Sequence, residues 1–564
     1  MRHMFWATGL MLACATGATA QDRPTIYSGG TILTMAGDTP ETVEAVVSEG
    51  GIIRFAGARA EAEARFGAGA EHIDLRGRTM LPGFIDAHSH FSSGLMQAGG
   101  VNLGSPPVGT VTSVAGLIEA LRAHIASRAP AAGSWIVGWN YDQSQLAEAR
   151  HVSRAELDAA FPDYKIVLLH VSGHGAVLNG AALAAAGINA ATPDIAGGVI
   201  GRDANREPNG LLMETAMFTA MAALPRPDAA QRLAALDVMQ NAYFAQGYTH
   251  AQEGAAQMAD IRFLTSDAAR ARLRIDMSIE VLFTELPALI ANPVQPFGQW
   301  RDHVKLQGVK FLLDGSPQAR TAYFTHPYLH GGPNGESDWH GTPIVDQATF
   351  NTLARQVHEA GLQLFMHANG DAAIDMAING LESLGIRASD DRRPVVIHSQ
   401  FQRLDQLPRY AAIGVGPSYF TNHTFFWGDV HVGNVGAAMA NGISPLRSAR
   451  AAGLHLSNHT DYPVTPLDTR FMLWSATART SRTGAVIGEA ERVDTYAALQ
   501  VLTTGPAWQM FEEGRKGRIA EGLLADFVIL DRNPLDTPVD GLRSIRVVAT
   551  IKDGVTVYGG VDAP

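Results

Sequence analysis

Hydrophobic positions in the middle of the chain follow two periods in turn, which predicts helices alternating with strands. The clearest helix is predicted over 346–361, capped by Asp346 and ended by Gly361, with one apolar face made of Phe350, Leu353, Ala354 and Val357. A second helix follows, ended by Gly385, with a face of Ile374, Ala377, Ile378 and Leu381. Because helices separate the strands, the sheet is predicted to be parallel.

Short apolar runs between the helical patterns are the candidate strands of an α/β fold. They lie near 84–90, 247–253, 275–283, 307–313, 362–368, 394–399, 411–417 and 453–461. Eight strands are the number that closes a (β/α)8 TIM-like barrel. An open, doubly wound sheet is the alternative.

The domain boundaries follow from changes in this pattern. The barrel is predicted over 83–504, and the gap of about 101–245 between its first two strands is too long for a crossover, so it predicts an inserted subdomain on the catalytic face. Both ends of the chain carry short strand-like runs with turns between them. We expect 21–82 and 505–564 to form one composite β-sandwich; two separate β appendages are the alternative.

The N-terminus has the pattern of an export signal. Arg2 and His3 precede an apolar run over 4–13, and the small residues 18–20 fit a cleavage site, so 1–20 is predicted to be a signal peptide of a periplasmic or secreted protein. The run is too short for a stable membrane span; a buried N-terminal helix is the alternative. Cys14, the single cysteine, lies in a poor lipid-attachment box because Leu12 stands where a small residue is expected, so a lipoprotein is the less favoured outcome. A mature chain without cysteine would hold metals through nitrogen and oxygen.

Composition narrows the classes of partner. The chain has 564 residues, of which 46% are hydrophobic, and this is ample for a large buried core. Its net charge of -12, without basic runs, gives no support for binding nucleic acid or anionic membranes. The expected partner is a small-molecule substrate, and a homo-oligomer is left open.

The strongest local motif is the His-x-His of residues 88–90. In a strand, residues two apart point to the same side, so His88 and His90 are expected to face the barrel axis together. Two imidazoles on one face can converge on one metal ion.

Four further polar residues fall at the ends of later candidate strands: Lys310, His367, His398 and Asp461. A lysine within an apolar run is costly to bury as a bare cation. Carbamylation by CO2 would turn Lys310 into a carboxylate able to bridge two cations. The alternative is an ion pair of Lys310 with Asp314 or Glu253.

Together these positions resemble the amidohydrolase superfamily, specifically its amidohydrolase-3 branch, which includes the N-substituted formamide deformylases. The resemblance covers nearly everything after the N-terminal signal. It implies two divalent metal ions, zinc first and manganese or another ion as alternatives. It assigns His88, His90 and Asp461 to the more buried ion, His367 and His398 to the other, and Lys310 to a bridge. Many relatives have Glu where this chain has Ile397 and a small residue where it has His459, and these departures leave the substrate open.

The resemblance implies a hydrolase that cleaves a C–N amide-type bond in an N-substituted formamide, an N-acyl amine or a cyclic amide. Two cations that share a hydroxide would supply the nucleophile near neutral pH, and Asp461 would move its proton to the leaving amine. A mononuclear deaminase, a lactonase or esterase, and an inert binding protein are the alternatives. Candidate substrate-binding residues are Trp139, Tyr141, His174, His423 and His459, with internal packing of a large loop as the other interpretation.

Overall fold

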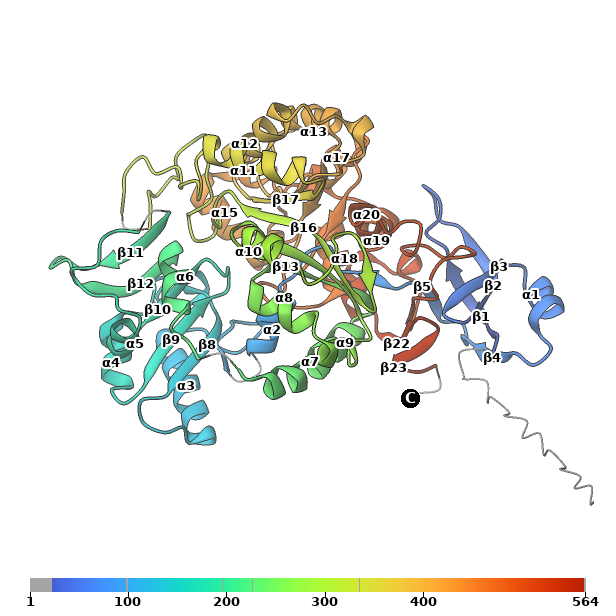
Figure 1. The fold of residues 1–564 in the computed structure, drawn as a ribbon, viewed down its shortest axis with the longest axis horizontal. Coiled ribbons are helices and arrows are strands. Elements are labelled where there is room, and N and C mark those ends of the chain that lie inside the picture. The colour runs from blue at the N-terminus through green and yellow to red at the C-terminus, as the bar shows by residue number, and fades with distance from the viewer. Residues whose placement is uncertain (1–22, 98–99, 196, 226, 334, 562–564) are drawn as a thin grey trace, which may run out of the picture.

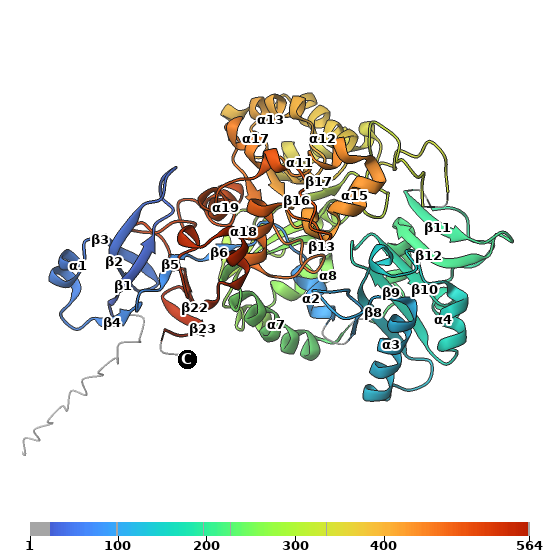
Figure 2. The same ribbon diagram turned by 180° about the vertical axis from the view of Figure 1, so that it is seen from behind.

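The computed structural model describes residues 23–561 except 98–99, 196, 226 and 334, and within these residues the strands form three sheets. Figures 1 and 2 show a central α/β body with one sheet from the chain ends on one side and the sheet of the inserted segment on the other. The predicted signal peptide and Cys14 lie outside the described residues.

The central sheet contains eight parallel strands in chain order, with a short antiparallel strand, β15 (Trp300–Arg301), beside β16. The strands are β6 (Phe84–Ile85), β13 (Tyr248–Ala256), β14 (Asp276–Leu282), β16 (Val304–Leu312), β17 (Gln363–Ala368), β18 (Val395–His398), β19 (Gly416–Tyr419) and β20 (Ser457–Asn458). The sheet curls so that its two ends approach each other. His90 N donates to Tyr462 O at 2.7 Å, and Asp461 N donates to His88 O at 3.1 Å. The segments that follow the first and last strands therefore lie side by side.

Three strands are shorter than predicted or displaced. Residues 86–90 leave the first strand after Ile85, and the run 453–461 forms a strand only at 457–458. The run 411–417 is wrong at its start, because 411–413 end helix α13 (Leu407–Ile413) and Gly414, at φ 82°, turns the chain into β19. Apolar alternation does not separate the last turn of a buried helix from a short strand.

Helices cover the outside of the central sheet. The predicted helix after Asp346 is confirmed as α11 (Gln347–Glu359): the Asp346 side chain accepts Thr349 N at 2.7 Å. The second is α12 (Asp371–Ser383). Their apolar faces pack against the outward side chains of β16, such as Val309 and Phe311, in one buried cluster. Inward side chains of the same strands are therefore left to form the site.

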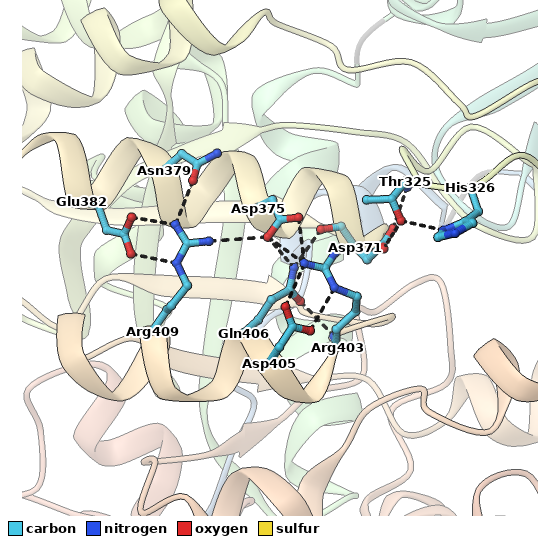
Figure 3. Close-up of polar contacts among 10 residues, drawn as sticks. All are labelled: Thr325, His326, Asp371, Asp375, Asn379, Glu382, Arg403, Asp405, Gln406 and Arg409. Carbon is cyan, nitrogen blue, oxygen red and sulfur yellow. Dashed lines mark hydrogen bonds and ion pairs between the residues drawn. The ribbon is translucent and has the colours of Figure 1, made fainter.

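Ion pairs fix the segments that follow β17 and β18 (Figure 3). Arg403 lies 3.0 Å from Asp371 Oδ2 and 3.0 Å from Asp375 Oδ2, which binds the segment after β18 to α12. Arg409, on α13, pairs with Glu382 of α12 at 2.6 Å. The strands that end in His367 and His398 are thus held in register by contacts outside the site.

Both ends of the chain contribute to one sheet. β5 (Thr79–Pro82) pairs antiparallel with β21 (Phe527–Leu530), so N-terminal and C-terminal strands share a ladder. The order is β23-β22-β21-β5-β1-β2-β3, with β4 beside β1. All these strands belong to a single hydrogen-bonded sheet, and the predicted β-sandwich is not confirmed. The remaining bounds are β1 (Thr25–Leu33), β2 (Thr42–Glu49), β3 (Ile52–Gly57), β4 (Glu71–Asp74), β22 (Val547–Lys552) and β23 (Val555–Gly559).

The segment between β6 and β13 forms its own six-stranded sheet, in the order β11-β12-β10-β9-β8-β7. Its elements are α2 (Phe91–Gln97), β7 (Val101–Asn102), α3 (Val114–Arg128), β8 (Trp135–Tyr141), α4 (Arg154–Ala160), β9 (Lys165–His170), β10 (Gly175–Leu178), α5 (Gly180–Ala185), β11 (Gly198–Arg202), β12 (Pro208–Glu214), α6 (Thr215–Met221) and α7 (Ala229–Phe244). Several residues of this segment line the cavity beside the candidate site.

The other α-helices are α1 (Arg59–Phe66), α8 (Met258–Leu264), α9 (Asp267–Arg270), α10 (Leu286–Ala291), α14 (His423–Phe426), α15 (Gly428–Val435), α16 (Ala437–Ala440), α17 (Leu446–Ala451), α18 (Thr469–Ala478), α19 (Thr495–Gln500) and α20 (Thr504–Gln509). Among the described residues, none of the helices has both the length and the apolar character that a membrane crossing requires.

Candidate metal centre

The six residues predicted to hold metal come together at the carboxyl ends of the central strands. Asp461 Oδ1 lies 3.4 Å from His88 Nε2 and 3.2 Å from His90 Nε2. Lys310 Nζ lies 3.2 Å from His88 Nε2. His367 Nδ1 and His398 Nε2 face each other at 3.0 Å, and the rings of His88 and His398 are 5.7 Å apart.

The donor atoms fit a divalent cation. One ligand atom each of His88, His398 and Asp461 lies within 4.8 Å of the others. Asp461 Oδ1 is buried and accepts no hydrogen bond from the described residues, although it faces two imidazoles. A buried carboxylate oxygen without a hydrogen bond is costly, and a cation would satisfy it. Imidazole nitrogen with carboxylate oxygen is a donor set that suits zinc or manganese.

Backbone geometry turns two of these side chains into the site. Val396 packs in the helix-facing cluster and Ile397 in an inner cluster, so strict alternation would place His398 on the outer side. His398 instead has φ 70°, in the left-handed region, and its ring reaches His367 and His88. Asp461 also has a positive φ, 51°. Non-glycine residues in this region are uncommon and cluster at functional sites.

Burial holds the histidines neutral. It lowers the pKa of His88, His367 and His398 well below the ordinary value, and the positive charge of Lys310 adds to the effect. Neutral imidazole is the form that ligates metals. The cluster is thus ready to bind cations without first losing protons.

Lys310 is 1% exposed and sits among these imidazoles. Burial lowers its pKa to about 8, while the charges of Glu280 and Asp461 act in the opposite direction. The alternative ion pairs are not seen in the described residues: Asp314 accepts backbone N–H groups, as from Asn369 at 2.9 Å, and Glu253 accepts from Ser92 N. Among the residues that the structure describes, Lys310 therefore forms no ion pair with a carboxylate.

Two residues behind His88 were not predicted from the sequence. Gln252 Oε1 lies 3.1 Å from His88 Nδ1, and Glu280 Oε2 lies 3.8 Å from it. Glu280 is fully buried, neither oxygen has a hydrogen bond among the described residues, and burial raises its pKa well above the ordinary value. The sequence did contain a signal for Glu280, because Ser278 and Glu280 alternate with Ile279 and Val281 in β14 and so share one face of the strand.

Residues predicted to hold metal lie in the wall of a cavity of about 490 Å³. His90, Lys310, His367, His398 and Asp461 line one part of it. The inserted segment supplies much of the rest, with largely apolar side chains that include Trp135, Trp139, Leu169, Met217, Phe218, Met221 and Leu224. A large nonpolar group would be accommodated beside the polar centre.

The five candidate substrate-binding residues fall in two groups. Trp139 and His174 line the cavity. Tyr141, His423 and His459 do not: the Tyr141 hydroxyl lies 3.0 Å from His151 Nδ1, and His423 Nδ1 lies 3.0 Å from His431 Nε2. These two residues join internal polar contacts, as the packing alternative expects. His459 is buried behind the site, with its ring 5.3 Å from that of His88 and 5.0 Å from that of His398.

Comparison with known proteins agrees with this geometry. The chain belongs to the amidohydrolase family, whose model matches residues 71–558. This membership makes the protein a hydrolase of the amidohydrolase class, and His88, His398 and Asp461 form a candidate site for a metal ion.

Two relatives and one solved structure illustrate the match. The N-substituted formamide deformylase of Arthrobacter pascens is 28% identical over 91% of this chain and 95% of its own length. YtcJ, described as an amidohydrolase of Bacillus subtilis (strain 168), is 27% identical over 94% of this chain and 99% of its own. An uncharacterized metal-dependent hydrolase from Pyrococcus horikoshii OT3 shares the fold, with a TM-score of 0.72 and 22% identity over 92% of this chain and 99% of that one.

Proposed function

We propose that the protein hydrolyses a C–N amide-type bond in a neutral substrate: an N-substituted formamide, an N-acyl amine or a cyclic amide. The observation that carries this proposal is a nitrogen and oxygen donor set at the end of a cavity with largely apolar walls. The similarity to a formamide deformylase supports the first of these substrates.

His88, His90 and Asp461 would hold one cation and His367 and His398 a second, with Lys310, as its carbamate, between them. Divalent cations there, two zinc ions in the first instance, would polarise a carbonyl oxygen and lower the pKa of water to near neutrality. The imidazoles are already neutral, as this assignment needs, and burial lowers the pKa of Lys310 to about 8, which increases the share of the neutral amine that reacts with CO2.

Asp461 is the proposed catalytic base. Burial raises its pKa, but the nearby His90, His459 and Lys310 together outweigh burial, so the pKa lies below the ordinary value. The carboxylate is therefore ionised at neutral pH and can accept a proton from water at one oxygen. It would then return that proton to the leaving nitrogen, which makes a poor amide anion a good neutral amine.

The apolar part of the cavity would take the substituent on nitrogen or the acyl chain. Arg232 also lines the cavity, but its guanidinium lies 2.9 Å from Asp260 and their charges offset each other. A substrate without a carboxylate is therefore preferred to an N-acyl amino acid.

A mononuclear deaminase is the second candidate, since His88, His398 and Asp461 by themselves form a compact set for one cation. A lactonase or esterase would use the same centre. A binding protein without activity would hold metal and turn over none of these compounds.

A substrate screen with metal analysis separates these functions. Protein loaded with Zn²⁺ or Mn²⁺ is tested on N-alkyl formamides, N-acyl amines, cyclic amides, lactones and amino-substituted heterocycles, with His90→Ala as the control for contaminating enzymes. We expect amine release from amides, about two metal ions per chain, and no activity in the control. Ammonia release from a heterocycle with one ion per chain would replace the proposal by the deaminase.

We also propose that the protein is exported, on the N-terminal pattern of residues 4–20. Cell fractionation with sequencing of the mature N-terminus tests this, and an uncleaved chain in the cytoplasm would contradict it.

A further inference from the structure

The inserted segment brings a histidine to the metal centre. His174 lies between β9 and β10, lines the cavity, and its ring is 5.0 Å from that of His367. Its backbone N donates to Ser172 Oγ at 3.1 Å. The loop therefore holds an imidazole beside a predicted metal ligand, although the two residues belong to different sheets.

Glu214 binds this imidazole from the last position of β12. Its Oε2 lies 2.7 Å from His174 Nδ1, and its backbone N donates to the His174 carbonyl at 2.9 Å. The two residues are thus joined through both side chain and backbone. Glu214 is 5% exposed and has φ 52° and ψ −129°, a backbone conformation that non-glycine residues rarely adopt. Such conformations persist where surrounding contacts impose them, and they cluster at functional sites.

Gly315 makes room for this arrangement. A Cβ added at Gly315 would come within 2.2 Å of Glu214 Oε1, and the Gly315 carbonyl lies 3.3 Å from His367 Nε2. The carboxylate therefore packs directly on backbone that also contacts a predicted metal ligand. Glu214, His174 and His367 form one connected group.

The Nδ1 atom of His174 is occupied by Glu214, which leaves Nε2 as the ring's remaining hydrogen-bonding atom. No partner for Nε2 is found among the described residues. We propose that His174 Nε2 hydrogen-bonds the amide group undergoing cleavage, and that Glu214 is a positioning residue that fixes the ring. His174 then recognises the reacting group, whereas Trp139 and Met221 contact the apolar substituent.

This inference rests on the proposed function, because it names a contact to the amide of that reaction. Substrates of different length distinguish a contact to the amide from a contact to the substituent. Loss of His174 should lower kcat/KM by about 10-fold or more on both N-methylformamide and N-hexylformamide, since the lost hydrogen bond is to the amide that they share. Met221→Ala, the matched control, should affect only the hexyl compound.

The variants are His174→Leu, His174→Gln, Glu214→Ala, Glu214→Gln and the double variant His174→Leu/Glu214→Ala. Metal content and circular dichroism are measured on each, and the glutamine variants serve where a larger change prevents folding. His174→Gln should recover part of the activity, because its amide reaches the position of Nε2. If Glu214 acts through His174, the double variant should be no worse than His174→Leu.

Calorimetric binding of acetohydroxamate, an amide mimic, to the Zn²⁺-loaded variants gives a readout without turnover. We expect a Kd at least about 5-fold weaker in His174→Leu and in Glu214→Ala at unchanged metal content. If the wild type hydrolyses no amide, the proposed function fails while this arm still decides the contact. A Kd and kcat/KM within 2-fold of wild type in His174→Leu would overturn the role of His174, and additive losses in the double variant would overturn that of Glu214.

Discussion

Replacement of Lys310 with alanine tests whether this residue bridges two metal ions as a carbamate. The reaction with CO2 requires the neutral amine, so the pKa of the lysine decides how readily it occurs. With an ordinary pKa of 10.5, about 0.03% of the side chain is neutral at pH 7; with a pKa of about 8 the fraction is about 9%. Burial therefore raises the reactive fraction roughly 300-fold.

The carbamate would supply two oxygen ligands where the amine supplies none. Changes to groups that only orient metal ligands lower metal affinity by about 10–100-fold. Loss of the bridge itself should exceed this, so Lys310→Ala should hold at most one ion per chain where the wild type holds about two. Excess acetate or propionate should partly restore metal and activity by occupying the vacated space.

The assay is metal analysis after dialysis, with reconstitution of the stripped wild type in the presence and absence of bicarbonate. Lys305→Ala is the matched control, because Lys305 is also buried in β16 but donates to Glu512 and to Met510 O, away from the site. Its change should lower stability and leave the metal content as in wild type. Full metal content in Lys310→Ala, or reconstitution that ignores bicarbonate, would refute the bridge.

Three further substitutions test separate parts of the molecule. Asp461→Asn should lower kcat by about 10²–10⁴ while much of the metal remains, and an unchanged kcat would remove Asp461 from proton transfer. Asp276→Ala removes one of the two carboxylates that the buried Lys516 and Lys552 share and leaves Asp526 as the other. Thermal or urea unfolding should therefore show a loss of about 2–3 kcal/mol, which a change below 1 kcal/mol would contradict. Burial raises the pKa of Asp142, but the contact with His170 more than offsets burial and gives a pKa of about 2, against the ordinary 3.8. The ionised Asp142 therefore stabilises the fold above about pH 4, and this stabilisation is lost as the pH falls toward 2. In Asp142→Asn the free energy of unfolding in urea should change less with pH over that range, and an unaltered pH dependence would count against the pairing with His170.

The alternating pattern of the sequence was sufficient for the main architecture. Helices α11 and α12 and the parallel order of the central strands follow from spacing, because one face of each element must be buried. The same rule predicted that His88 and His90 face one side, and both do reach Asp461, although they lie beyond the end of β6. It could not give the arrangement of the terminal strands, where pairing between residues far apart in the chain decides whether one sheet or two is formed.

The site shows where such rules stop. His398 enters the candidate metal centre because its φ is positive, against the alternation of Val396 and Ile397. Its inclusion came from its place at the end of a candidate strand and from resemblance to a family, and not from strand parity. Glu214 carries no local signal for its contact with His174, since the two are joined by the β10–β12 pairing of the inserted sheet.

The pairing of β5 with β21 has a consequence for the order of folding. Pro82 and Phe527 are partners in this ladder, so the N-terminal strands cannot complete their sheet until almost the whole chain has been made. Contacts between such distant residues form slowly, and until then the edge of β5 is open to other chains. A product that ends before Phe527 would keep that edge exposed and should aggregate. The terminal sheet can therefore be completed only after synthesis has passed β21, near the end of the chain.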